Sequence, residues 1–487
     1  MAITTSGTVG ERAPADRRRY LILAICCMIL FIVGLDNTIV NVALPSIRHD
    51  LDASIPQLQW TIDAYTLVLA SLLMLSGSMA DRLGRARVFK VGLALFTVGS
   101  LLCSVAPTVQ LLIVFRMVQA VGGSMLNPVA MSIIRNTFTD PRERAQAIGL
   151  WAGVIGVSMA LGPVLGGVLV ESGGWRDVFW VNVPVGLVAI ALTRRFVPES
   201  KAPRARRVDP VGQLLVILLL ASTVYGIIDG PAAGWLSPRT VGLFALAAIV
   251  ARGLVSYERR RVDPLIDVGF FHSAPFSGAT VIAIAAFTAL GGFLFLNTLY
   301  LQSSRGLSPL QAGLYTLPMA AITVVVGPLT GRLVGARGAR PSLVIGGAAI
   351  LLSGLMLTTV TVTTSPAWLI ASYVLFGVGF GSVNPPITNT AVSGMPPAQA
   401  GVASAVASTS RQVGQSLGVA IVGAVAVSGA SGGGIALASH PGWWIVSGCG
   451  ALIVVLGVLT TSRWALGTAT TTAMRLREEP QAASAGA

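Results

Sequence analysis

The sequence has little charge. Only 11% of its 487 residues are Asp, Glu, Lys or Arg, whereas soluble globular chains are about 25% charged. Hydrophobic residues make up 54% of the chain, and the mean hydropathy is +0.77. This balance excludes an ordinary soluble domain. Because the apolar residues gather in long runs, it predicts an all-α polytopic membrane protein.

Cysteine and histidine are also scarce. The four cysteines lie in apolar runs without a CxxC pair, and the three histidines fall between those runs. This spacing offers neither a disulfide framework nor a cluster of metal ligands, so we expect no metal site. A GxxxxGKS nucleotide loop and a nucleophile–base pair are missing too. We therefore expect neither an enzyme nor a protein that needs a cofactor.

Basic residues are more numerous, and they give a net charge of +14, although only two of the 33 are lysine. No basic domain gathers this charge, so nucleic acid is not expected as a partner. The basic residues lie instead in short stretches between apolar runs. Loops on the cytoplasmic side of a membrane carry such an excess of Lys and Arg.

Fourteen apolar runs are long enough to cross a bilayer. They cover residues 20–44, 57–79, 88–106, 108–134, 143–170, 176–196, 210–229, 238–257, 275–302, 309–333, 341–362, 366–390, 399–428 and 442–464. With the N-terminus inside, the cytoplasmic segments hold 27 of the 33 basic residues. The outer segments hold four, and two lie within spans. This alternation predicts fourteen spans with both termini cytoplasmic.

An internal repeat divides the chain. GSMADRL (77–83) returns as GPLTGRL (327–333), and VGGSMLNP (121–128) returns as VGFGSVNP (378–385). Two related six-span halves of this kind are used by transporters that rock about a central site. The predicted parts are a cytoplasmic N-terminus (1–19), two halves (20–197 and 273–464), an inserted helix pair with its cytoplasmic linkers (198–272), and a disordered cytoplasmic tail (465–487).

Four stretches carry a family resemblance. LDNTIVNVALP (35–45), GSMADRLGRAR (77–87), FRMVQAVGGS (115–124) and GPVLGGVL (162–169) are similar to motifs that occur in this order in the fourteen-span drug–proton antiporters of the major facilitator superfamily. The chain resembles that family over nearly its whole length. The resemblance implies the major facilitator fold with an inserted two-helix hairpin. It also implies a bacterial plasma-membrane protein that works as a monomer and is driven by the proton gradient.

Three charged residues lie inside the predicted spans of the first half. From the helical rise, Asp36, Asp63 and Arg116 are each on the order of 10 Å below the outer surface. Burial disfavours an ionised carboxylate and a nearby arginine favours it, so a balanced acid can bind and release protons. We predict a proton-coupling site at these three residues, where Asp36 either carries protons or binds a cationic substrate. Two alternatives stay open: a static ion pair of Asp36 or Asp63 with Arg116, and interaction of Asp63 only with a helix dipole or an interfacial water.

The loop motif combines glycine with charge. Gly77 and Gly84 allow a tight turn, while Arg82 and Arg85 stay at the headgroups. The motif is either a plain topology signal or a cytoplasmic gate in which Asp81 meets a helix N-terminus or a basic partner in one transport state only. The resemblance favours the gate.

GPVLGGVL supplies a small-residue helix face. Gly162, Gly166 and Gly167 permit close backbone approach, and Pro163 bends the helix. We predict antiporter-type packing between the two halves at the outer gate, with simple tight packing as the alternative.

The second half has no acid inside its spans, and its one deep charge is Arg411. Polar side chains there and in the first span are candidates to line a substrate cavity, or else to form hydrogen bonds between helices. The cavity candidates are Asn37, Asn41, Asn297, Tyr300, Asn384 and Arg411.

These features together predict a proton-coupled antiporter that exports amphipathic organic compounds by alternating access. Proton-coupled uptake of a nutrient or metabolite on the same fold is the main alternative. A membrane enzyme, receptor or channel fits less well, because the corresponding site motifs are missing.

Overall fold

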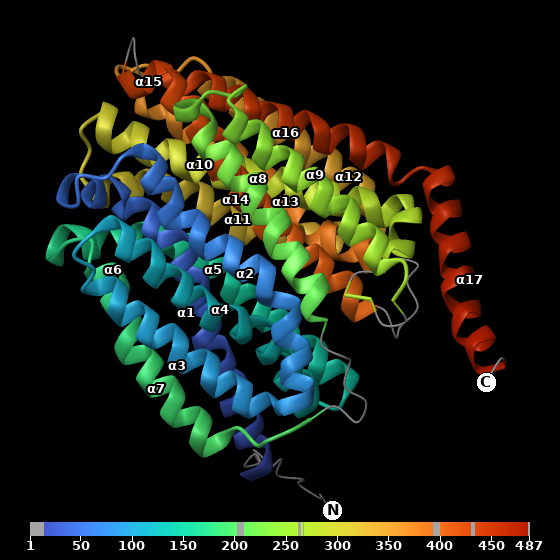
Figure 1. Ribbon diagram of the computed structural model, residues 1–487. Coiled ribbons are helices and arrows are strands. Elements are labelled where there is room, and N and C mark those ends of the chain that lie inside the picture. Colours follow the sequence, from blue (N-terminus) through green and yellow to red (C-terminus); the bar gives the residue numbers. More distant parts are fainter. Residues whose placement is uncertain are drawn as a thin grey trace, which may run out of the picture.

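The computed structural model is built from helices packed side by side (Figure 1). It describes residues 14–201, 209–261, 264, 265, 267–392, 400–429 and 434–485. Parts of the predicted N-terminus, of the cytoplasmic linkers and of the C-terminal tail therefore lie outside the described residues.

The first half contains six long helical segments. They are α1 (Pro14–Asp50), α2 (Ile55–Leu83), α3 (Arg85–Ser104), α4 (Val109–Thr137), α5 (Pro141–Gly173), and a sixth broken into α6 (Asp177–Trp180) and α7 (Asn182–Phe196). Its helix starts are marked in the sequence. Ser54 and Gln57 form a capping box at the start of α2, and the Asp140 side chain accepts hydrogen bonds at the start of α5.

The second half repeats this plan. It contains α10 (Ala274–Leu299), which continues into a π-helical turn (Tyr300–Ser304), α11 (Pro309–Arg337), α12 (Ala339–Leu357), α13 (Pro366–Val392), α14 (Ala400–Gly429), the short α15 (Gly434–Ala438) and α16 (His440–Leu459). A capping box of Ser308 and Gln311 begins α11, as Ser54 and Gln57 begin α2.

The packing pattern also recurs. The pairs α1–α5, α2–α4, α3–α4 and α3–α7 of the first half match α10–α14, α11–α13, α12–α13 and α12–α16 of the second. The halves meet chiefly through α5 against α11 and α2 against α14. Such reciprocal contacts are what a two-fold repeat generates.

A helix lies at each of the fourteen predicted spans, but not every one qualifies as a membrane span. Among the described residues, twelve helices are long and apolar enough to cross a bilayer. Helices α5 and α14 are not among the twelve. The supported statement is an all-helical fold with twelve candidate spans.

The inserted pair consists of α8 (Pro210–Ala233) and α9 (Pro238–Glu258). Helix α8 packs against α9, α2 and α14, so it lies along the seam between the two halves. Leu67 of α2, Val224 and Ile228 of α8, and Ala420 of α14 form a small apolar core there. Much of α9 is exposed on the protein surface, as expected for a helix that faces lipid.

The tail differs from its predicted disorder, because residues Arg463–Ala485 form helix α17 (Figure 1). Its start is docked: the Ala274 amide donates to Thr468 Oγ1 at 2.9 Å, and α17 packs against α10. Alanine, arginine and leucine, which favour helix, then continue it.

Candidate functional site

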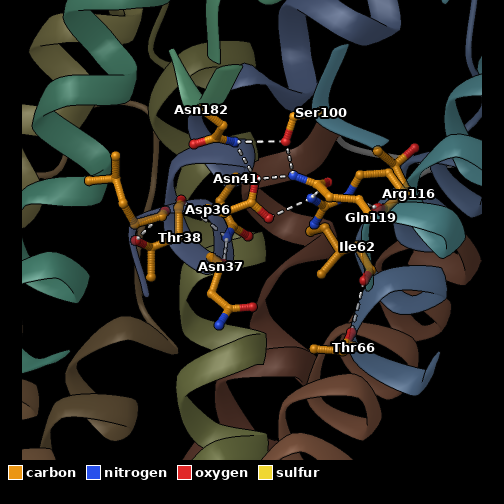
Figure 2. Close-up of polar contacts among 12 residues, drawn as sticks. Asp36, Asn37, Thr38, Asn41, Ile62, Thr66, Ser100, Arg116, Gln119 and Asn182 are labelled. Carbon is orange, nitrogen blue, oxygen red and sulfur yellow. Dashed lines mark hydrogen bonds and ion pairs between the residues drawn. The ribbon is translucent and has the colours of Figure 1, made fainter. Parts of the chain in front are cut away.

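A buried charge network surrounds Asp36 in the middle of the first half (Figure 2). The Asp36 side chain on α1 is fully buried, and its Oδ2 accepts a hydrogen bond from Arg116 Nη1 of α4 at 2.6 Å. Its Oδ1 accepts from Gln119 Nε2 at 2.9 Å and from Asn182 Nδ2 at 3.1 Å. Both oxygens are therefore satisfied, and a buried carboxylate with these partners is well compensated in its charged form.

Arg116 is equally enclosed. It is 1% exposed, Nη1 also donates to Gln119 Oε1 at 2.6 Å, and Nε donates to the Thr61 carbonyl at 3.3 Å. Its guanidinium carbon lies 4.0 Å from the centre of the Tyr65 ring, which adds a cation–π contact. These contacts fix the arginine between α1, α2 and α4.

Three of the network residues were not predicted. Gln119, Ser100 and Asn182 appear in the sequence as isolated polar residues inside apolar helices. Ser100 Oγ accepts from Gln119 Nε2 at 2.7 Å and from Asn182 Nδ2 at 3.3 Å. A signal existed for Gln119, because it follows Arg116 by three residues and so lies on the same helix face. No sequence spacing links Ser100 and Asn182 to Asp36.

Asp63 lies apart from this network, although the sequence predicted it at the same depth. It is fully buried, and neither carboxylate oxygen has a hydrogen-bond partner among the described residues. Ser416 of α14 is near enough to interact with the carboxylate, but its geometry falls short of a hydrogen bond. Tyr65, two residues after Asp63, packs against Arg116. Two residues turn a helix by about 200°, so Asp63 faces away from Arg116 and toward Ser416 of the other half.

The loop motif is held within its own half. Arg85 Nη2 donates to Asp81 Oδ1 at 2.9 Å, and Arg82 is exposed. The carboxylate of Glu199 accepts from the Ala86 and Arg87 amides, both at 3.0 Å, at the start of α3. Gly84 has φ +112°, and a side chain there would collide with Glu199. Gly77 has an ordinary contact with Pro128.

The glycine face of α5 has two partners. Gly162 and Gly166 pack against Thr38 and Ile39 of α1, which belongs to the same half. A Cβ on Gly167 would lie 2.6 Å from the Leu310 Cα of α11, in the other half. Pro163 meets Gly313 of α11 through its carbonyl oxygen. The predicted contact between halves therefore rests on Gly167 and Pro163.

Hydrogen bonds join the halves near the helix ends farthest from the loop motif. Gln59 Nε2 of α2 donates to the Val419 and Ala420 carbonyls of α14 at 3.1 and 2.9 Å. Gln302 Nε2 donates to the Val42 carbonyl at 2.9 Å. The Ser308 hydroxyl donates to Glu171 Oε2 at 3.0 Å. The halves are therefore closed against each other at this end.

Three cavity candidates of the second half, Asn297, Tyr300 and Arg411, have structural partners. The Tyr300 hydroxyl donates to the Thr361 carbonyl at 2.6 Å, and Asn297 Oδ1 accepts from the Tyr373 hydroxyl. Arg411 donates to Thr388 Oγ1, and its Nε has no partner among the described residues.

The asparagine candidates are less engaged. On α1, the Asn41 amide donates to the Asn37 carbonyl at 3.4 Å (Figure 2). The side-chain oxygens of Asn37, Asn41 and Asn384 have no partner among the described residues. Within the described part of the chain, no group of three or more His, Cys, Asp or Glu side chains lies close enough together to hold a metal ion.

Comparison with known sequences gives a consistent set of relatives. The sequence profile of the Major Facilitator Superfamily matches residues 26–419. Multidrug resistance protein Stp of Mycobacterium tuberculosis is 36% identical over 84% of this chain and 76% of its own length. Methylenomycin A resistance protein of Streptomyces coelicolor is 35% identical over 87% and 90%, respectively. Multidrug efflux pump LfrA of Mycolicibacterium smegmatis is 36% identical over 84% and 81%.

Solved structures share the fold at low identity. A bacterial homolog of the human lysosomal transporter Spinster matches 96% of this chain and 99% of its own, with a TM-score of 0.64 and 17% identity. A D-xylose–proton symporter matches 91% and 97%, with a TM-score of 0.65 and 15% identity. At these identities the likeness concerns the fold alone.

Proposed function

Because this chain belongs to the major facilitator superfamily, we propose that it is a proton-coupled antiporter that exports amphipathic organic compounds by alternating access. The observation that carries the proposal is its similarity to several resistance and efflux proteins. Three of these are 35–36% identical over at least 84% of this chain and three quarters of their own lengths. The chain therefore contains most of what such an exporter needs.

The proposed topology has fourteen spans, with α5 and α14 added to the twelve candidates. These helices have 33 and 30 residues, more than the roughly 20 that a bilayer requires. They pack against α1 and α10 inside the halves and against α11 and α2 across them. The two halves, the inserted pair and both cytoplasmic ends keep the predicted boundaries, in a bacterial plasma membrane, and the protein works as a monomer.

In this proposal the two acids of the first half divide the work. Protonating Asp36 would leave Arg116 buried and uncompensated, which typically costs roughly 3–5 kcal/mol. Asp36 and Arg116 therefore form a fixed ion pair that holds the helices in register. Asp63 has no such partner among the described residues, and taking up a proton removes the cost of a bare buried charge. It is the residue that binds and releases the coupled proton.

The conformational parts follow from the same contacts. Gly167 and Pro163 form the outer gate with α11, where the halves meet in this structure. Asp81 is bonded within its own half here, and it forms the cytoplasmic gate when that end closes. The amphipathic substrate binds between the halves, where Asn37, Asn41, Asn384 and Arg411 offer polar groups.

Everted membrane vesicles test export directly. With a proton gradient that acidifies the lumen, the wild-type protein should accumulate a lipophilic cation such as tetraphenylphosphonium or a neutral amphipathic dye, and a protonophore should abolish the accumulation. Vesicles without the protein are the control. If the vesicles instead lose a preloaded compound as protons flow out of the lumen, the protein would move that compound into the cell, and export would be refuted.

A further inference from the structure

A row of buried polar side chains follows the seam where α8 of the inserted pair packs between α2 and α14. On α2 the row contains Gln59, Asp63 and Ser71, whose spacings of four and eight residues keep them on one side of the helix. Gln213 of α8 donates to the Ser71 carbonyl, and Ser416 of α14 lies beside Asp63. Each of these five side chains is at most 4% exposed.

Many polar atoms in this row lack a protein partner. Among the described residues, no hydrogen bond reaches Gln59 Oε1, the two Asp63 oxygens, Ser71 Oγ, Gln213 Oε1 or Ser416 Oγ. Buried polar atoms are nearly always bonded to protein or to ordered water. So many open positions along one seam indicate that water completes them.

The seam also has room for water. A cavity of about 60 Å³ lies between the three helices, and a single water needs only about 10–15 Å³ by this measure. Most of its walls are apolar, and Thr223 of α8 and Ser416 of α14 are the polar residues there that could hold a water. The apolar wall residues are Leu67 and Ala70 of α2, Leu220 and Val224 of α8, and Val413 and Leu417 of α14. Ser416 lines the cavity and also lies next to Asp63, so it is the residue that the two share.

We propose that this seam is a hydrated proton path to Asp63, with α8 of the inserted pair as one wall. A hydrated proton passes along water and the hydroxyls of Thr223 and Ser416 to an Asp63 oxygen, and the same proton leaves when Asp63 ionises. Without α8 the seam would face lipid tails, which conduct no protons. The inserted pair would then supply the coupling acid with water, a role that rests on Asp63 as the proton carrier.

Among the described residues, Asp63 forms neither a hydrogen bond nor an ion pair with a charged side chain. Arg116 of α4 is bonded to Asp36, and Arg411 of α14 donates to a threonine of α13. On the inserted pair, Asp229 near the outer end of α8 is paired with Arg239 of α9 at 3.1 Å.

The first test measures water in the cavity without relying on transport. In a Cys449→Ala background in proteoliposomes, Thr223→Cys should react with a small water-soluble thiol reagent at least about tenfold faster than Leu218→Cys. Leu218 lies on the same helix and is 39% exposed on the protein surface, so it is the matched lipid-facing control. Thiols react as hydrated thiolates, which lipid excludes. Equal, slow labelling at both positions would overturn the hydrated path.

The second test blocks the path and leaves Asp63 intact. Leu220→Phe should fill part of the cavity with its larger side chain and slow tetraphenylphosphonium–proton exchange several-fold, with an unchanged Kd. Leu218→Phe should exchange at the wild-type rate. Normal exchange in Leu220→Phe together with loss in Asp63→Asn would refute the path alone. Normal proton-coupled exchange in Asp63→Asn would refute the proposed role of Asp63 itself.

Discussion

Replacing Asp36 by asparagine should destabilise the protein strongly, although the two side chains have nearly the same shape. In the structure, one carboxylate oxygen accepts from Arg116 and the other accepts from Gln119 and Asn182. An asparagine amide has one oxygen and one NH₂ group, so its NH₂ must face Arg116 or the two amide donors. Gln119 cannot turn to relieve this conflict, because its own oxygen already accepts from Arg116.

The cost has two parts. Loss of the negative charge leaves the buried Arg116 uncompensated, which typically costs roughly 3–5 kcal/mol. In addition, the asparagine NH₂ faces another N–H donor, and each buried group that is left without a hydrogen bond lowers the free energy of unfolding by about 1–3 kcal/mol. Arg116→Gln in the same chain removes the stranded charge, so the double variant should recover most of the stability. That recovery distinguishes an ion pair from a position that is merely intolerant of change.

Scanning fluorimetry of the detergent-purified variants provides the assay. Asp36→Asn should melt several degrees below the wild type. Asp63→Asn is the matched control, because Asp63 is equally buried but has no hydrogen-bond partner in the described part of the chain. It should melt at or above the wild-type temperature. If Asp36→Asn is as stable as the wild type, or if Asp63→Asn loses as much, the division between a structural and a coupling acid is wrong.

Three further changes probe the gates and the loop. Gly167→Val should force α5 and α11 apart at the outer end and lengthen the distances between spin labels on the two helices there. Gly153→Ala should leave these distances unchanged, because an added Cβ at that position meets nothing. Unchanged distances in both variants would refute the gate. Glu199→Gln should weaken the start of α3 by about 1 kcal/mol, with faster amide exchange at its first residues; unchanged exchange would contradict this capping. Asp81→Ala should lower transport at unchanged abundance, and full transport would favour a plain topology signal.

Much of the helical layout could be predicted from the sequence, because membrane spans are recognised by the length of their apolar runs and by the charge of the loops between them. The first residues of α2 and α11 were further marked by the serine caps Ser54 and Ser308. The start of helix α17 was also marked locally, because the Ser462 hydroxyl accepts from the Ala465 amide, but its docking through Thr468 to the Ala274 amide was not. A contact between residues so far apart in the chain has no local signal.

The membrane depth of the three charged residues could be predicted from the sequence, but the direction in which their side chains point could not. The helical rise located Asp36, Asp63 and Arg116 at one level, and the structure joins the first and last of them. Which way Asp63 points depends on the rotation of α2 against α14, and hydropathy does not determine that rotation. The proposed role of Ser416 was not predicted either. The hydroxyl of a serine in an apolar helix usually donates to a backbone carbonyl of the same helix, so its presence alone indicates no site.

Proton release from purified protein on addition of substrate tests the central claim most directly. In weakly buffered detergent solution, tetraphenylphosphonium should displace protons from the wild type and from the Asp36→Asn, Arg116→Gln double variant, because both retain Asp63. Asp63→Asn should bind the cation and release none. Undiminished release from a well-folded Asp63→Asn would contradict the account and return the coupling role to Asp36.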